Sequence, residues 1–151
     1  RPHQEATVGL TGRKLGNSVR DLLDHARAQL DERAEPQLRP PVQRLLGHLY
    51  SSLGEPRIAA RLFAEGLAGV EAHERGEALA LADDYDGYAT ALGALERGAD
   101  SLAAAQRGAA LRRRFAPGDA EQELRSLAQL GFGYYRIQDY AAAEAAWTRA
   151  I

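Results

Sequence analysis

The chain has 151 residues, a formal net charge of −2, 45% hydrophobic residues and no cysteine. This length and composition suit a single domain with a core, and the missing cysteines exclude a disulfide framework and a thiolate zinc site. No apolar run reaches the roughly 18 residues that a transmembrane helix takes, so membrane insertion is not expected. Charges of both signs are spread along the chain, which argues against a nucleic-acid partner.

The chain begins with a segment that lacks a hydrophobic period. Residues 1–16 contain three glycines and are expected to form a linker or a loosely docked segment. Asn17 or Ser18 can then cap a leading helix over 17–32. An amphipathic stripe at helical spacing supports this helix and consists of Val19, Leu22, Leu23, Ala26 and Leu30.

From about residue 37 onward the chain repeats itself every 42 residues. A step of this length leads from Gly131 back to Ala89 and then to Gly47, three small residues. Large and small residues keep their columns together, which chance matches in an alanine-rich chain do not explain. The other columns are Leu46, Tyr88 and Leu130; Tyr50, Leu92 and Tyr134; Leu53, Leu95 and Ile137; Ala59, Ser101 and Ala143; Phe63, Ala105 and Trp147; Gly66, Gly108 and Ala150.

Each copy predicts a pair of helices. Leu130, Gly131 and Tyr134 share one face of a first helix, and Ala143 and Trp147 share one face of a second helix. The small column lets the two helices approach closely, and the bulky columns fill the space beside it. Because such pairs cannot bury their apolar faces alone, they are expected to stack. The three repeats are expected at about 37–72, 77–115 and 119–151.

Breaking and capping residues predict the helix ends. The second helix of the first repeat is expected to run from Pro56 to Ala72, and the next helix to begin at Glu77 after Gly76. Asp119 is a candidate cap for the first helix of the third repeat.

The pattern Leu-Gly-x-x-Tyr at 130–134, followed by Ala143, Trp147 and Ala150, resembles the tetratricopeptide repeat. The core unit of that family has about 34 residues. The 42-residue spacing is therefore similar to its kinesin-light-chain-like subclass, which is common in bacterial proteins. The second copy departs from the pattern, with Ser101 in an alanine column. The resemblance implies an all-α fold, a right-handed α-solenoid of stacked antiparallel helix pairs.

Two features suggest a larger parent protein. The run Ser-Val-Arg-Asp-Leu-Leu-Asp at 18–24 resembles the helix that leads into such repeats in bacterial proteins where a Ser/Thr kinase domain precedes them. The chain lacks a starting methionine and ends inside the second helix of a repeat. A fragment of a longer, cytoplasmic signalling protein is expected, and eighteen arginines against one lysine suggest a GC-rich bacterial genome.

No set of residues that could catalyse a reaction converges in the sequence. The run 131–136 lacks the third glycine of a dinucleotide fingerprint. The four histidines fall in separate elements, so no metal site is expected. We therefore expect no enzyme activity, no cofactor and no metal in this chain.

Two charged clusters have ordinary explanations. Asp83, Asp84 and Asp86 are expected to interact with a helix dipole and with solvent, and the alternative is an acidic wall of a binding groove. Three consecutive arginines are expected to form a solvated helix end. These are Arg112, Arg113 and Arg114.

The resemblance implies a concave groove, lined by the first helices of successive repeats, that would bind a peptide or protein. Aromatic groups supply contact area there, and arginine pairs with carboxylates. The family's clamp for the C-terminal carboxylates of chaperones places Asn where this chain has Leu45, Gly87 and Gln129, so that specificity is not expected. The other groove residues carried over are Arg44, His48 and Ser52 in the first repeat, Asp83, Asp86 and Thr90 in the second, and Arg125, Phe132, Tyr135 and Arg136 in the third.

Two other interpretations stay open. The groove could be filled by the chain's own flanking helix. The chain could also be a structural solenoid that associates with itself through its ends and forms a homo-oligomer.

Overall fold

The computed structural model describes residues 12–151, with side chains from residue 18 onward. This part of the chain consists of helices and connections and contains no strand, which confirms the all-α class. Residues 1–11, most of the expected linker, lie outside the described residues. The described helices are α2 (Gly12–Arg33), α3 (Arg39–Ser52), α4 (Pro56–Leu67), α5 (Arg75–Ala94), α6 (Gly98–Phe115), α7 (Ala120–Arg136) and α8 (Tyr140–Ala150).

The leading helix α2 begins earlier than predicted, at Gly12. Residues 12–16 of the expected linker are therefore helical. Asn17 and Ser18 lie inside the helix, so the prediction that one of them caps its start is wrong.

The connection between α4 and α5 also differs from its prediction. α4 ends at Leu67, short of Ala72, and Gly69 adopts a φ of 68°, a left-handed conformation that a right-handed helix does not continue. α5 begins at Arg75. The residue before it, Glu74, caps the helix, because its carboxylate accepts a hydrogen bond from the backbone N–H of Glu77 at 3.2 Å. The break expected just before Glu77 therefore lies inside the first turn of α5.

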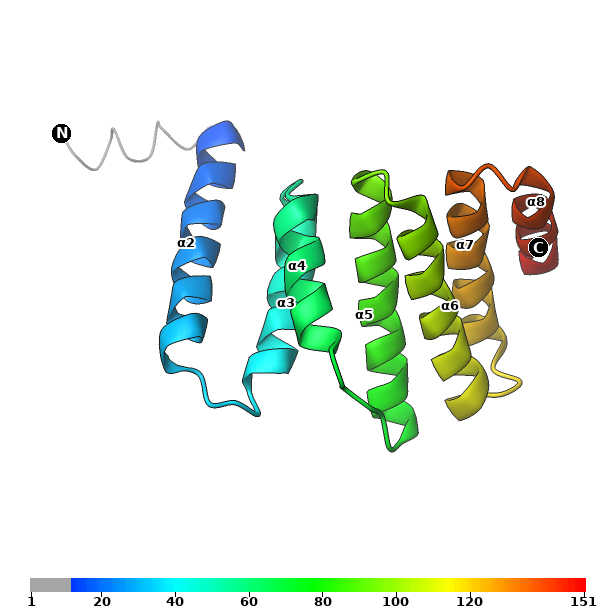
Figure 1. The fold of residues 1–151 in the computed structure, drawn as a ribbon, viewed down its shortest axis with the longest axis horizontal. Coiled ribbons are helices and arrows are strands. Elements are labelled where there is room, and N and C mark those ends of the chain that lie inside the picture. The colour runs from blue at the N-terminus through cyan, green and yellow to red at the C-terminus, as the bar shows by residue number, and fades with distance from the viewer. Residues whose placement is uncertain (1–11) are drawn as a thin grey trace.

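The helices follow one another in chain order along the longest axis, with α2 at one end and α8 at the other (Figure 1). Consecutive helices run antiparallel and form three closely packed pairs, α3 with α4, α5 with α6, and α7 with α8. Each pair packs on the next through α4 against α5 and α6 against α7. Because α3 also contacts α5, and α5 contacts α7, the first helices of the pairs lie side by side.

The turn inside each helix pair repeats at the predicted period. One residue takes a left-handed φ in every turn, 75° at Gly54, 59° at Glu96 and 65° at Gln138. This conformation costs a residue other than glycine about 1–2 kcal/mol, so the common turn overrides the local preference of Glu96 and Gln138. The following N–H closes each turn at 3.0 Å, from Glu55 to the carbonyl of Tyr50, from Arg97 to that of Leu92, and from Asp139 to that of Tyr134.

Small and large residues meet between the paired helices, as the columns predict. A Cβ added at Gly47 would lie 3.0 Å from the ring of Phe63, and one added at Gly131 would overlap the ring of Trp147. In the second pair the bulky position holds only Ala105, which is 1% exposed. At this position the helices of that pair therefore meet through small residues, Ala89 and Ala105.

The leading helix α2 docks on α3 by one side only. Its inner side buries Leu30 and partly buries Leu23. The hydroxyl of Tyr50 in α3 donates a hydrogen bond to Oδ1 of Asp24 at 2.5 Å. The outer side leaves Leu22 70% exposed. Three of the five residues in the predicted amphipathic stripe are exposed, namely Val19, Leu22 and Ala26.

Candidate functional site

The first helices α3, α5 and α7 carry the residues that were expected to line a groove, and they differ in accessibility. The partly buried members are Arg44, His48, Asp86, Gly87, Gln129 and Arg136. The exposed members are Leu45, Ser52, Asp83, Thr90, Arg125, Phe132 and Tyr135.

Arg44 and His48 are bonded to neighbouring helices, although the side chain of His48 stays 43% exposed. Both bind Asp84 of α5, with Nε of Arg44 2.8 Å from Oδ2 and Nε2 of His48 2.8 Å from Oδ1. Arg44 also donates from Nη1 to the carbonyl of Gly66 at 2.8 Å. The ring of His48 stands edge-on to Phe63, with centroids 4.8 Å apart. These side chains join α3 to α4 and α5, which leaves them little capacity for a ligand.

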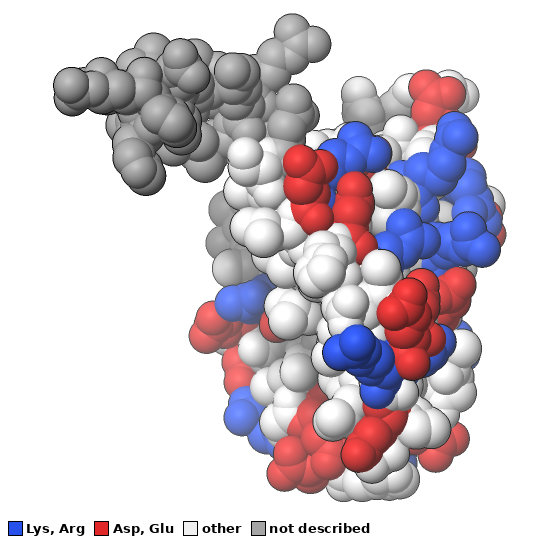
Figure 2. Space-filling model, turned by 90° about the vertical axis from the view of Figure 1, so that its left-hand side faces the viewer, with Lys and Arg blue, Asp and Glu red and all other residues white. Residues whose placement is uncertain are grey.

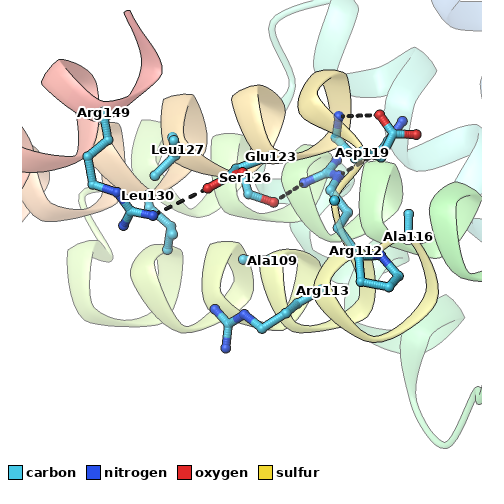
Figure 3. Close-up of a pocket in the computed structure, with 13 residues that line it drawn as sticks. Ala109, Arg112, Arg113, Ala116, Asp119, Glu123, Ser126, Leu127, Leu130 and Arg149 are labelled. Carbon is cyan, nitrogen blue, oxygen red and sulfur yellow. Dashed lines mark hydrogen bonds and ion pairs between the residues drawn. The ribbon is translucent and has the colours of Figure 1, made fainter.

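A second charged network surrounds Arg112, which is only 2% exposed. The predicted solvated helix end is therefore wrong for this residue. Its guanidinium donates to Asp83 at 2.9 Å and to Asp86, both on α5, and to Gln122 at 3.1 Å on α7. It also donates to Ser126 of α7 at 3.4 Å (Figure 3). Burial raises the pKa of Asp86 above its ordinary value, although the paired arginine opposes that shift. Asp86 thus ties α5 to α6 rather than facing solvent.

The repeat register contains a signal for the burial of Arg112. This residue stands one period after Val70, which packs against the core. An apolar counterpart indicates a column that faces inward, and an inward-facing arginine takes carboxylate partners. Arg113 and Arg114 are exposed, in agreement with the prediction.

Exposed aromatic side chains gather on α7 and α8. Phe132 is 48% exposed and Tyr135 is 54% exposed. The ring of Phe132 meets that of Trp147 edge to face, with centroids 5.3 Å apart, and Tyr135 lies 6.1 Å from Trp147 and 5.6 Å from Tyr140. We call Phe132, Tyr135, Tyr140 and Trp147 the aromatic face.

Arg136 lies beside the aromatic face and has no carboxylate partner among the described residues. Its Nη1 donates to Oγ of Ser101 at 3.0 Å, and its guanidinium lies 5.8 Å from the ring centre of Phe132. Burial lowers the pKa of Arg136. Arg44, which is partly buried, and Arg112, which is buried, each pair with a carboxylate. The charge of Arg136 has no such partner among the described residues.

Two pockets recur at equivalent places in successive helix pairs. One, of about 370 Å³, lies between the connection 68–74, α5 and α6, and we call it the 68–74 pocket. The other, of about 260 Å³, lies between the connection 116–119, α6, α7 and α8, and we call it the 116–119 pocket (Figure 3). Five residues of the 68–74 pocket have a counterpart one period later in the lining of the 116–119 pocket. These pairs are Val70 and Arg112, Glu71 and Arg113, Leu81 and Glu123, Tyr85 and Leu127, and Arg107 and Arg149.

Charge and composition limit what these surfaces can hold. The face seen from the α2 end shows acidic and basic side chains interspersed with uncharged ones (Figure 2). Within residues 12–151, no group of three or more His, Asp or Glu side chains is arranged to hold a metal ion. None of the helices in that range is both long and apolar enough to cross a bilayer.

Comparison of the chain with models of known protein families, with curated proteins and with solved structures gave no match. The fold and the arrangement of its polar and aromatic side chains are therefore the observations that bear on function.

Proposed function

We propose that the chain is a non-catalytic module that binds a peptide or another protein along the face formed by α3, α5 and α7. The observation that carries this proposal is the aromatic face beside Arg136. About half of the surface of Phe132 and Tyr135 is open, and Arg136 holds no carboxylate of the described chain. Aromatic anchors supply much of the binding energy at protein interfaces, and arginine pairs with carboxylates. A peptide with an acidic residue next to an apolar one suits this surface.

The binding surface would centre on α7, which carries Phe132, Tyr135 and Arg136. Arg44 and His48 of α3 already bind Asp84, so α3 offers mainly Leu45 and Ser52. The exposed Arg125 of α7 is paired with Glu121 at 3.4 Å and with Asp83 at 3.7 Å.

The 42-residue period supports a tetratricopeptide-like interpretation, in which the helix pairs form a right-handed solenoid with α2 as its leading helix. By this analogy the module would be the sensor or scaffold part of a larger cytoplasmic signalling protein of a bacterium, with a Ser/Thr kinase as the candidate. A peptide map of the native protein from host lysate tests this. Peptides of a kinase catalytic loop in a band much larger than this chain would support it, and a band of this chain's own size would contradict it.

A displayed library of short random peptides tests the binding proposal. Selected peptides should carry an acidic residue beside an aromatic or aliphatic one. Their affinity should fall about tenfold or more in Phe132→Ala and in Arg136→Gln, because each change removes an anchor. Leu124→Ala is the matched control, since Leu124 is also 48% exposed on α7 and lies outside the expected groove. Failure to enrich any peptide, or an equal loss in the control, would contradict the proposal.

A second candidate function is self-association through the ends. The aromatic face and the outer side of α2, with Val19 38% and Leu22 70% exposed, are apolar surfaces at opposite ends of the row of helices (Figure 1). Light scattering over a range of concentrations tests this candidate. A mass that rises with concentration and falls back in Leu22→Asp would support it, and a constant monomer mass would exclude it.

A further inference from the structure

We propose that the 68–74 pocket is a separate binding site for a carboxylate attached to a small apolar group. The site is independent of the peptide-binding proposal, because it is built by the connection 68–74, α5 and α6 and includes no residue of the aromatic face.

The floor of the pocket is apolar and well packed. Leu81 and Tyr85 of α5 are 4% and 8% exposed, and Ala72 of the connection is 8% exposed. Leu111 of α6 also lines the pocket and packs against the core. A volume of about 370 Å³ is in the range of small-molecule sites, so an aliphatic or aromatic group fits there.

The wall that α6 contributes is cationic. Arg107 and Arg114 line the pocket, and in the described part of the chain neither has a carboxylate within ion-pair distance. The guanidinium of Arg107 lies 5.7 Å from the ring centre of Tyr85, and that of Arg114 lies 4.8 Å from that of Phe115. The cation–π contact with Tyr85 holds Arg107 beside the apolar floor without neutralising its charge, whereas the partner of Arg114, Phe115, lies outside the lining.

The equivalent 116–119 pocket shows which group the 68–74 pocket lacks. There Arg149, one period after Arg107, pairs with Glu123 at 3.3 Å (Figure 3). In the 68–74 pocket the column of Glu123 holds Leu81. In one pocket the arginine is therefore paired with a carboxylate of the protein, and in the other Arg107 lies over an apolar floor without such a pair.

The connection that forms the opposite wall is fixed at its end. The carboxylate of Glu77 accepts a hydrogen bond from the N–H of His73 at 3.3 Å, and Glu74 accepts one from the N–H of Glu77 at 3.2 Å. Glu71 is the acidic side chain in the lining, and it is exposed. It would compete with an external carboxylate for the arginines.

A titration with 3-phenylpropionate, followed through the backbone amide signals of the full chain, tests the proposal. Saturable shifts should appear in the connection 68–74 and in α6, and the neutral 3-phenylpropionamide should bind about tenfold more weakly. Arg107→Gln should weaken the acid by a similar factor. Arg113→Gln removes a neighbouring exposed arginine that lies outside this pocket and should change nothing. Glu71→Gln should strengthen binding.

Equal binding of the acid and the amide would overturn the proposal. It would also be overturned by equal losses in Arg107→Gln and Arg113→Gln, or by the absence of saturable shifts at the pocket. The capped dipeptide acetyl-Phe-Glu-amide separates two sources of the same chemistry. Tighter binding of the dipeptide supports a partner protein as the source, and tighter binding of the free acid supports a small metabolite.

A gain-of-function variant gives an independent check. Glu123→Gln removes the carboxylate that Arg149 holds, and both side chains are more than half exposed, so the fold should tolerate the change. The variant should acquire acid-dependent shifts around the 116–119 pocket that the wild type lacks. If the variant shows no such shifts, the difference in charge between the pockets does not govern binding and the proposal fails.

Discussion

Equivalent pairs of aromatic rings occur in the first and in the third helix pair, and they differ in how far a neighbouring helix covers them. His48 and Phe63 meet edge to face at 4.8 Å, and Phe132 and Trp147, two periods later, meet edge to face at 5.3 Å. α5 covers the first pair so closely that a Cβ at Gly87 would lie 2.8 Å from Phe63. Phe63 is 0% exposed, whereas its counterpart Trp147, two periods later, is only partly buried. Among the described helices, none covers the second pair of rings as α5 covers the first.

The chemistry of the two surfaces differs as well as their coverage. In the first pair Arg44 and His48 bind Asp84 of the covering helix. Two periods later the same positions hold Ala128 and Phe132. The open surface therefore has no basic side chain at its centre that could bind a carboxylate. Arg136 at its edge is the group that would bind one.

The largest expected effect is a difference in the free energy of unfolding between two variants, one without the ring of Phe63 and one without the ring of Trp147. Phe63→Ala should lower the free energy of unfolding by about 3–5 kcal/mol, because it leaves a cavity in the core. Trp147→Ala should cost about 1–3 kcal/mol, since Trp147 is only partly buried and neighbours can collapse around it. Urea denaturation of both variants measures the difference. Equal costs would mean that the third pair is as well covered as the first.

Removing Arg112 breaks the contact between the second and third pairs. Arg112→Met should cost about 3 kcal/mol, because it leaves Asp86 buried without its partner. The pKa of Asp86 is already raised, so proton uptake by Asp86 limits the loss. Arg113→Met, on the exposed side of the same helix end, is the control and should cost nearly nothing. A cost below about 1 kcal/mol for Arg112→Met would show that the network is not stabilising.

A smaller effect is expected from crowding the covered pair. Gly87→Ala should cost about 1–3 kcal/mol, because the added Cβ would lie 2.7 Å from His48 and 2.8 Å from Phe63. Gly76→Ala in the first turn of α5 is the comparison, and it should cost less, because the added Cβ would lie 3.1 Å from one side-chain oxygen, that of the capping Glu74. Thermal unfolding should separate the two variants, and a harmless Gly87→Ala would contradict the close approach of α5.

The contact between Tyr50 of α3 and Asp24 of α2 should make the stability of the protein depend on pH. Burial, followed by the hydrogen bond to Asp24, raises the pKa of Tyr50 to about 12 from its ordinary value of 10.0. The folded state holds this proton more tightly than the unfolded state, so its contribution to stability is complete below pH 10 and is lost as the pH rises towards 12. Unfolding midpoints of the wild type should fall relative to Tyr50→Phe over that range. Parallel curves for the two proteins would contradict the assigned contact.

The periodic part of the fold could be predicted from the sequence because its causes are local. The close contact between Gly131 and Trp147 follows from columns that repeat, and it is confirmed. The cap is also confirmed, since the carboxylate of Asp119 accepts a hydrogen bond from the N–H of Gln122 at 3.2 Å.

The parts that the sequence did not predict depend on contacts between pairs. The burial of Arg112 depends on partners from α5 and α7, which local preference does not indicate. The early end of α4 depends on Gly69 and on the cap at Glu74, which together displace the connection from the repeat period. Whether Arg136 binds a partner stays a prediction, because its unpaired state shows only in the folded chain.

Native-state hydrogen exchange tests most directly the claim that each pair is stabilised by the helix that covers it. The amides of α4, whose Phe63 lies under α5, should open with a free energy at least about 2 kcal/mol greater than those of α8, whose Trp147 is only partly buried. Equal protection of α4 and α8 would contradict the claim. The aromatic face would then be part of a fully stabilised pair rather than an open docking surface.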